Sequence, residues 1–461
     1  MVFKDEEQSK LSVNSQVTSF SWNDVKQHTN RDSCWIVIDG DVYDITNWLG
    51  KHPGGDVVLL SAAAADCTDL FNAYHPQFVR DKLIKGFKIG RVSDYTVPKH
   101  LVEFRALAQK LESSSVMQTN PMYYFTLTLR FSILFAAVLL CVFFGPGSIW
   151  ISSCLGGIFM GSFFQQVAFV GHDLGHSSVT HSRKIDTFLG LFVGNMLTGI
   201  SMGWWKATHN AHHVATNFIT DDPDIQHFPF FAVAVEYLSG FESRYHEKIF
   251  TFTGISKILI PLQDKLYYLV MAVARYNLYI QSYLFLLTDS RFRNRRIKTA
   301  RNLELFGLIF FALWFCLLTS YLPTSSERIV FVLISHAVAG VLHVQITLSH
   351  FAMPVYTQKP WEVSTFVEHQ IKTSLDIDCY EWLDWFHGGL QFQVVHHLFP
   401  RVPRHNLRKL RAVIKSFALK HQIPYQCMGF LDANKYTIHH LSTVSSELKL
   451  GMLNDMVNMR G

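Results

Sequence analysis

The chain has 461 residues, of which 49% are hydrophobic and only 17% are charged. About 25% of the residues in an average soluble domain are charged, so this composition excludes an ordinary soluble protein and predicts apolar surface that lipid covers. The chain is also long enough for two or more structural units. The net charge of +5 is modest, which favours anionic lipid headgroups or an acidic protein partner over nucleic acid.

The N-terminal part of the chain has the pattern of a small soluble domain. Residues 1–17 form a polar tail without the apolar stretch of a cleaved signal peptide. Residues 18–91 contain short β-type runs, an Asp39-Gly40 pair typical of a hairpin turn, and polar helical stretches. We therefore expect a small α+β domain, followed by an amphipathic connector at residues 92–120.

This domain carries two histidines with the spacing of a haem site. His52 opens a His-Pro-Gly-Gly sequence, and His75 follows it 23 residues later. Two neutral imidazoles on opposite loops can bind a haem iron from both faces, which leaves no open site and limits the iron to one-electron transfer. Gly54 and Gly55 permit the tight turn that aims the first imidazole inward. The expected walls of the pocket are apolar: Ile45, Trp48, Leu59, Leu60, Leu70 and Phe71.

The sequence from Cys34 through the His-Pro-Gly-Gly turn resembles cytochrome b5, and the resemblance covers residues 18–91. It implies haem b with His52 and His75 as axial ligands, reduced by a separate NADH-cytochrome b5 reductase. The alternative is a simple turn with an ordinary surface histidine at position 75. The presence of both histidines at this spacing disfavours that alternative.

Four long apolar stretches follow, each close to the roughly 20 residues needed to cross a bilayer. They lie at residues 123–144, 148–170, 303–322 and 329–349. Short turns join them in pairs, so we expect two hairpins of transmembrane helices in an all-α membrane domain over residues 121–430. The long segment between the hairpins ends in a basic run at residues 291–301. The positive-inside rule places this segment, both termini and the tail at 431–461 in the cytosol.

Two further apolar stretches lie inside the long segment, at residues 187–202 and 266–287. They carry interruptions or adjoin charged residues, which predicts interfacial or re-entrant helices. A fifth or sixth membrane crossing is the alternative interpretation.

Histidines gather where the apolar stretches end. On a helix, i, i+3 and i+4 spacings place side chains on one face, and helices that bring such faces together can hold two metal ions. Imidazole suits iron, zinc or copper, so the spacing alone does not select the metal. The three clusters, or boxes, are His172 and His176; His209, His212 and His213; and Gln393, His396 and His397.

The fourth apolar stretch adds three histidines, His336, His343 and His350, each seven residues from the next. This spacing predicts one stripe along a helix that runs toward the cytosolic surface, and ionisable groups inside a span are costly and usually functional. We expect His350, at the cytosolic end, to be an eighth histidine ligand. We expect His343 to support the ligands or line a channel, and His336 to be a hydrogen-bonded core residue.

A haem that only carries electrons, fused to a histidine-rich site at a membrane surface, indicates a metal pair that activates oxygen. Zinc has no redox chemistry and would leave the electron donor without a purpose. Two irons that take up electrons one at a time could use O2 to remove hydrogen from two adjacent methylenes, which gives an alkene and water. A long acyl or sphingoid chain is the substrate that reaches such a site most easily.

The three boxes behind a cytochrome b5 domain resemble those of front-end lipid desaturases, over nearly the whole chain. In that family a glutamine opens the third box, as Gln393 does here. The stretches at 214–227 and 385–406 are similar to fungal sphingolipid Δ8 desaturases. The resemblance implies a multi-pass protein of the endoplasmic reticulum membrane, with a cytosolic histidine-rich cap, that introduces a Δ8 double bond into the sphingoid base of ceramide.

Three alternatives remain open from the sequence. A front-end acyl-lipid desaturase of the Δ5/Δ6 type or a lipid hydroxylase could use the same donor and boxes, although Gln393 favours desaturation over hydroxylation. A non-catalytic membrane haem protein with structural zinc is the third. Among nearby carboxylates, Asp173 either orients an imidazole or is a simple solvated polar residue. For Asp222 and Asp224, turn formation is favoured over a catalytic part.

Overall fold

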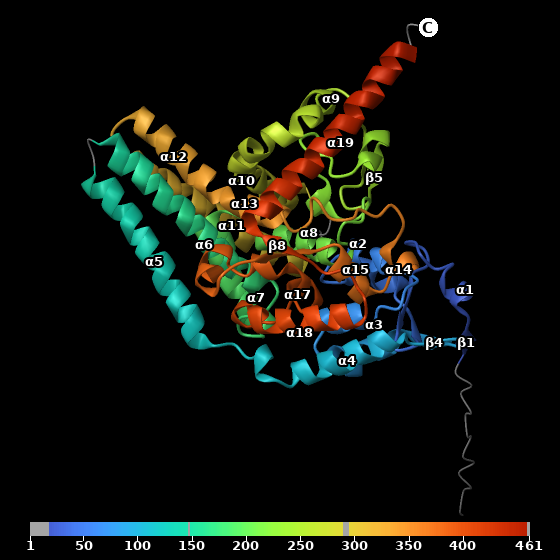
Figure 1. The fold of residues 1–461 in the computed structure, drawn as a ribbon. Coiled ribbons are helices and arrows are strands. Elements are labelled where there is room, and N and C mark those ends of the chain that lie inside the picture. The colour runs from blue at the N-terminus through green and yellow to red at the C-terminus, as the bar shows by residue number, and fades with distance from the viewer. Residues whose placement is uncertain (1–17, 146–147, 289–294, 459–461) are drawn as a thin grey trace, which may run out of the picture.

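The structure is a computed structural model that describes residues 18–145, 148–288 and 295–458. The predicted tail at 1–17 and the first four residues of the basic run at 291–301 lie outside the described residues. In Figure 1 the N-terminal domain and α4 (Lys99–Glu112) lie at one end of the molecule and the long membrane helices lie at the other. Helices α8 (Met202–Val214) and α17 (Gln393–Leu398) lie between them.

The N-terminal domain is built on a four-stranded sheet of order β1-β4-β3-β2, in which β1 and β4 are parallel and the other pairs antiparallel. The predicted hairpin at Asp39-Gly40 joins β2 to β3. Both residues have positive φ, 51° and 79°, as a two-residue type I′ turn requires. The α+β prediction is thus confirmed. The elements of this domain are β1 (Ser19–Phe20), α1 (Trp22–Val25), β2 (Trp35–Ile38), β3 (Asp41–Asp44), α2 (Val57–Ser61), α3 (Thr68–Tyr74) and β4 (Lys88–Val92).

The domain packs firmly against the rest of the chain. Leu70 and Phe71 of α3 belong to the same buried apolar cluster as Val394 and Leu398, which lie around the third histidine box. The connector forms α4 (Lys99–Glu112), and its apolar face, with Leu101 and Phe104 buried, contributes to this cluster. One continuous core therefore fixes the position of the N-terminal domain.

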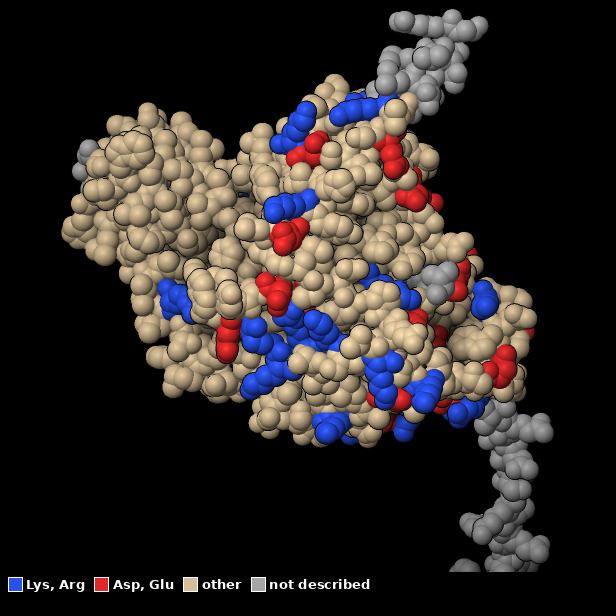
Figure 2. Space-filling view, viewed as in Figure 1, with Lys and Arg blue, Asp and Glu red and all other residues tan. Residues whose placement is uncertain are grey.

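Within the residues that the structure describes, four helices are long and apolar enough to cross a membrane, as predicted. They run along α5 (Pro121–Phe144), along α6 (Gly156–Gly175) with the π-helical turn before it, along α11 (Arg295–Ser320), and along α12 (Ser325–Ala339) with α13 (Val341–Thr347). Only 22% of the most apolar window of the α5 span is buried, so lipid must cover the rest. Figure 2 shows a lobe without charged side chains where these helices lie.

Helix α6 contacts α12 closely because it presents small residues. A Cβ atom on Gly161 would lie 2.5 Å from the carbonyl oxygen of Ser335, so only glycine allows this approach. The contact aligns the ends of these helices where the histidines of α6 and of the segment after α13 lie.

The stretch predicted to be interfacial or re-entrant is bent. Helix α7 (Arg183–Gly190) and the π-helix that follows it meet α8 (Met202–Val214) at 109°, so they add a fifth span only if the bent pair is counted as one. Helix α10 (Gln263–Thr288) does not reach the apolarity of a span within the described residues. The bend turns α8 toward the ends of α6 and α13.

The C-terminal segment is a long helix, α19 (Phe430–Asn458), that packs on α10. Gln263 of α10 donates from Nε2 to the carbonyl oxygen of Leu441 over 3.0 Å, and Ala433 and Leu441 are fully buried. Short elements complete the membrane domain: β5 (Phe241–Ser243), β6 (Lys248–Phe250), α9 (Ser256–Leu259), α14 (Pro360–Val363), α15 (Phe366–Lys372), β7 (Leu375–Asp378), α16 (Asp384–His387), α17 (Gln393–Leu398), α18 (Leu407–Lys420) and β8 (Gln426–Gly429).

Candidate haem and metal sites

The turn after His52 depends on two glycines for different reasons. A Cβ atom on Gly54 would lie 2.9 Å from Cε1 of the His52 ring, and Gly55 has a φ of 89° that side chains rarely adopt. Gly55 also donates its backbone N–H to the His52 carbonyl oxygen over 3.0 Å. The turn therefore holds the imidazole in one direction, as the sequence predicts.

The two histidines of this domain face each other across a space suited to haem. Their ring centroids are 6.1 Å apart. Two metal–nitrogen bonds of about 2 Å each, with the iron between them, fill such a gap. His52 donates from Nδ1 to the Gly55 carbonyl over 3.2 Å and His75 donates from Nδ1 to the Phe71 carbonyl over 3.1 Å, so both Nε2 atoms remain for the iron. Of the predicted wall residues, Ile45, Leu60, Leu70 and Phe71 belong to one buried apolar cluster, and Trp48 and Leu59 pack against it.

Burial keeps these imidazoles neutral. Loss of solvent and the nearby His52 together lower the pKa of His75 to about 4, and burial also lowers the pKa of His52. A neutral imidazole is the form that binds a metal ion, so both residues are ready to act as ligands at neutral pH.

In the membrane domain, the three boxes and His350 converge from four segments far apart in the sequence. His172 and His176 lie at the end of α6, His209, His212 and His213 on α8, and His396 and His397 on α17. The ligand nitrogens form two groups, within each of which all atoms lie within 4.8 Å of one another. The first group is His172, His176, His209 and His396, and the second is His212, His350 and His397.

The remaining box histidine, His213, lies between the two groups. Its Nε2 is 3.0 Å from Nε2 of His209 in the first group, and its ring stacks at 4.1 Å on that of His397 in the second. Two nitrogens bound to one ion at about 2.0–2.1 Å are separated by roughly 3 Å, so the first distance suits a shared ion. The structure thus brings together all eight predicted histidines.

Several ring nitrogens of this cluster are buried and have no hydrogen-bond partner among the described residues. They are Nε2 of His172, His176, His396 and His397, and Nδ1 of His213. Each such group costs about 1–3 kcal/mol if nothing satisfies it. Metal ions bound to the Nε2 atoms remove most of this cost, so the donor set fits a pair of imidazole-bound metals.

The second group is oriented by oxygen acceptors behind the rings. Nδ1 of His212 lies 2.9 Å from the Asp222 carboxylate, Nδ1 of His350 lies 3.1 Å from the Thr373 carbonyl, and Nδ1 of His397 lies 2.8 Å from the Gln370 side-chain oxygen. Each contact fixes the tautomer with Nε2 directed away from the acceptor. Gln370 and Thr373 carry no sequence signal that relates them to the boxes.

The favoured interpretation of Asp222 as a turn residue is incomplete. Its Oδ1 does accept the Asp224 backbone N–H over 2.9 Å, which is turn chemistry. However, the same carboxylate is fully buried and binds His212. Asp224 lies 3.8 Å from Nδ1 of His209, beyond hydrogen-bond distance, so this loop orients the second group directly through Asp222.

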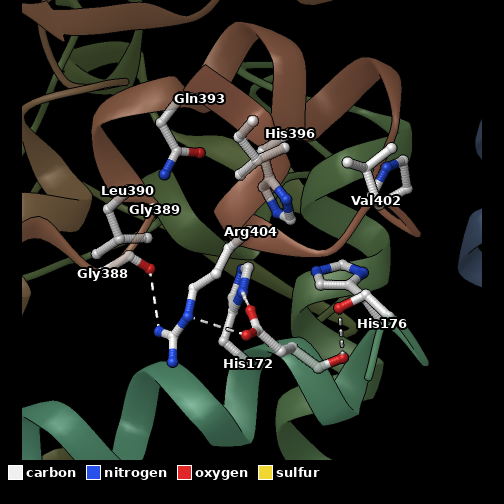
Figure 3. A pocket seen from close by; sticks show the side chains of 13 residues that line it. His172, His176, Gly388, Gly389, Leu390, Gln393, His396, Val402 and Arg404 are labelled. Carbon is white, nitrogen blue, oxygen red and sulfur yellow. Dashed lines mark hydrogen bonds and ion pairs between the residues drawn. The ribbon is translucent and has the colours of Figure 1, made fainter. Parts of the chain in front are cut away.

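Asp173 takes neither of the two roles that the sequence left open, since it is buried and does not orient an imidazole. Its Oδ1 is 3.8 Å from His172 Nδ1, too far for a hydrogen bond. Its carboxylate instead lies 3.0 Å from Nε of the buried Arg404 and accepts the Tyr124 hydroxyl over 2.9 Å. Arg404 also donates to the Gly388 carbonyl (Figure 3), so Asp173 ties the end of α6 to the loop after α17.

Gln393 is buried in the pocket that His172, His176 and His396 also line (Figure 3).

The prediction that His336, His343 and His350 form one stripe along a single helix is wrong in detail. Helix α12 ends at Ala339, α13 ends at Thr347, and His350 lies in the turn beyond.

The other two histidines of the predicted stripe lie outside both groups. His336 is paired through Nδ1 with the Val332 carbonyl and through Nε2 with the Tyr279 hydroxyl, as expected of a core residue. His343 donates from Nδ1 to the Met271 carbonyl over 3.1 Å. Neither is placed to share an ion with the box histidines.

Comparisons with known proteins agree with these two sites. Residues 148–429 match the family model "Fatty acid desaturase", and residues 21–93 match "Cytochrome b5-like Heme/Steroid binding domain". A Delta(8)-fatty-acid desaturase of Borago officinalis is 39% identical, over 93% of this chain and 94% of that protein. A Delta 8-(E)-sphingolipid desaturase of Komagataella phaffii is 33% identical over 95% of each chain, and an acyl-lipid (9-3)-desaturase of Borago officinalis is 37% identical over 93% of each.

The cofactors follow from the two matches together with the geometry. The cytochrome b5-like domain implies haem, and the paired histidine groups of a desaturase indicate a di-iron centre that uses O2. The four apolar helices fit a membrane-bound enzyme with a lipid substrate. The chain belongs to the fatty acid desaturase family, in the form that carries its own cytochrome b5-like domain.

Proposed function

We propose that the chain is a sphingolipid Δ8 desaturase, which introduces a double bond at carbon eight of the sphingoid base of ceramide. The observation that carries the proposal is a cluster of eight histidines, seven in two groups and His213 between them, at the ends of apolar helices and packed against the haem domain. The reaction takes two electrons, two protons and O2, removes two hydrogens from the lipid, and releases two waters.

In this proposal, His172, His176, His209 and His396 would hold one iron and His212, His350 and His397 the other, with His213 between the two groups. Gln393 lines the same pocket as His172, His176 and His396. The iron pair supplies the oxidising power that removes hydrogen from an unactivated methylene. His52 and His75 hold the haem that delivers electrons singly.

The surrounding residues keep this arrangement rigid and dry. Asp222, Gln370 and the Thr373 carbonyl each hold one imidazole in the tautomer that leaves Nε2 for the metal. His213, His397 and most of the other box histidines are buried, which excludes bulk water from the reacting lipid.

The substrate assignment rests on similarity. The relative from Komagataella phaffii is named a sphingolipid desaturase, and the stretches at 214–227 and 385–406 resemble fungal enzymes of that class. The relatives from Borago officinalis carry fatty-acid and acyl-lipid names, so an acyl-lipid substrate is the second candidate. We further propose that an NADH-cytochrome b5 reductase supplies the electrons and that the enzyme lies in the endoplasmic reticulum membrane, with the boxes and both termini cytosolic.

Expression in a host that lacks Δ8-unsaturated sphingoid bases tests the proposal. Sphingoid bases and fatty acids are both profiled by mass spectrometry, with a His176→Ala variant as the inactive control. A new diene base that the control lacks supports the ceramide substrate. A new polyunsaturated fatty acid without a new base transfers the assignment to acyl lipids, and a hydroxylated chain indicates a hydroxylase.

A further inference from the structure

One aromatic side chain of the haem domain reaches the histidine cluster. Tyr74 is the last residue of α3 and directly precedes His75, the second proposed haem ligand. Its ring centroid is 6.0 Å from that of His213, with the rings nearly perpendicular at 87°. A single side chain therefore bridges the space between the two cofactor sites.

The hydroxyl group of Tyr74 does not explain this placement. It is buried and makes no hydrogen bond with any described residue. The contribution of the side chain must come from its ring, which fills the gap beside His213.

Specific contacts hold α3 in this position. Arg401, four residues after His397, donates from Nε to the Ala73 carbonyl over 3.1 Å and from Nη2 to the Asn72 carbonyl over 3.3 Å. These carbonyls belong to the two residues before Tyr74. The segment that follows the third box thus fixes the end of the helix that leads to the haem.

His213 is also the histidine best placed to serve both metals. Its ring is 4.8 Å from that of His176 and 4.7 Å from that of His396 in the first group, and it stacks on His397 in the second. An electron that arrives at His213 is therefore adjacent to both proposed irons.

We propose that Tyr74 is the electronic link between the haem and the di-iron centre. The proposal rests on the function proposed above and adds the route of its electrons. In each transfer a ferrous haem becomes ferric and one ferric ion of the pair becomes ferrous; two transfers complete a turnover. Tyr74 stays a closed-shell neutral phenol throughout, so no proton moves with the electron.

The expected effect follows from the gap that a smaller side chain leaves. Electron transfer slows steeply as the gap without intervening protein atoms between donor and acceptor lengthens. Tyr74→Leu removes the ring that fills this gap. We expect this variant to slow haem re-oxidation at least about tenfold, which corresponds to ~1.4 kcal/mol in the barrier. Tyr74→Phe keeps the ring and should restore a rate close to that of the wild type.

The experiment uses the purified full chain loaded with haem and iron. The haem is reduced without oxygen, the protein is mixed with oxygenated buffer and ceramide, and the haem absorbance follows re-oxidation. Iron-depleted protein gives the rate of direct oxidation by O2, which is subtracted. The haem spectrum, midpoint potential and iron content must match the wild type. If Tyr74→Leu loses haem, Tyr74→Met, which fills more of the space without a ring, replaces it.

A matched control variant distinguishes the loss of the electron route through Tyr74 from a weakened contact between the haem domain and the membrane domain. Trp361 donates from Nε1 to the Ser61 carbonyl over 2.8 Å at the same interface, away from His213. Slow re-oxidation in Tyr74→Leu alone, with recovery in Tyr74→Phe, supports the proposal. A wild-type rate in Tyr74→Leu, or an equal loss in Trp361→Leu, overturns it. If the wild type re-oxidises haem through Tyr74 but forms no unsaturated lipid, the proposed function fails and the electron route stands.

Discussion

The ion pair between Asp173 and Arg404 offers a quantitative test of how the histidine cluster is held. Arg404 is 6% exposed and Asp173 is 4% exposed, and the pair joins the end of α6 to the loop after α17. Arg404→Leu leaves the Asp173 carboxylate buried without its cation. Loss of one partner from a buried pair costs about 3–5 kcal/mol, because the remaining charge stays out of water.

Thermal unfolding of the purified chain in detergent measures this cost. For a large domain, 1 kcal/mol corresponds to about 2 °C, so Tm should fall by about 6–10 °C in Arg404→Leu. The double variant with Asp173→Asn removes the unpaired charge and should recover part of the loss.

Arg408→Leu is the matched control, since its partner Asp384 is 35% exposed and such pairs contribute less than about 1 kcal/mol. An equal fall in Tm for Arg404→Leu and Arg408→Leu, or no recovery in the double variant, would refute this reasoning.

Three further outcomes are expected. His52→Ala should abolish lipid product but leave non-haem iron bound, as product profiling and metal analysis can show; full activity would remove the electron-donor role. His350→Ala should lose about one of the two proposed non-haem irons, whereas His343→Ala, which lies in neither group, should keep both. Burial raises the pKa of Asp376 to about 6 from 3.8, so the native chain keeps a proton that the unfolded chain releases. Its contribution to stability is greatest below pH 4 and is lost as pH rises through 6, a change of about 3 kcal/mol that Asp376→Asn should abolish in pH-dependent unfolding.

Local spacing explains why much of the site could be predicted. The His52 turn needs only its two neighbouring glycines, and the i, i+4 pair of His172 and His176 shares a helix face in any helix. His350 could be predicted because it follows an apolar stretch that must end near the other boxes. These signals depend on a few adjacent residues and on the fixed thickness of a bilayer.

The remaining features depend on tertiary packing that no local pattern encodes. Gln370 and the Thr373 carbonyl reach the boxes only because α15 and the turn after it pack beside α17. Arg404 and Asp173 are far apart in sequence but form an ion pair in the folded chain. The Asp173 carboxylate therefore binds Arg404 and does not orient an imidazole. The contact of Tyr74 with His213 likewise requires the docked haem domain.

Metal analysis of the purified full chain tests the central claim most directly. If the converging imidazoles bind a redox-active pair, each chain should contain two non-haem irons in addition to the haem iron, and His213→Ala should reduce that number. Protein that forms the unsaturated lipid with no non-haem iron, or with zinc in its place, would contradict the account.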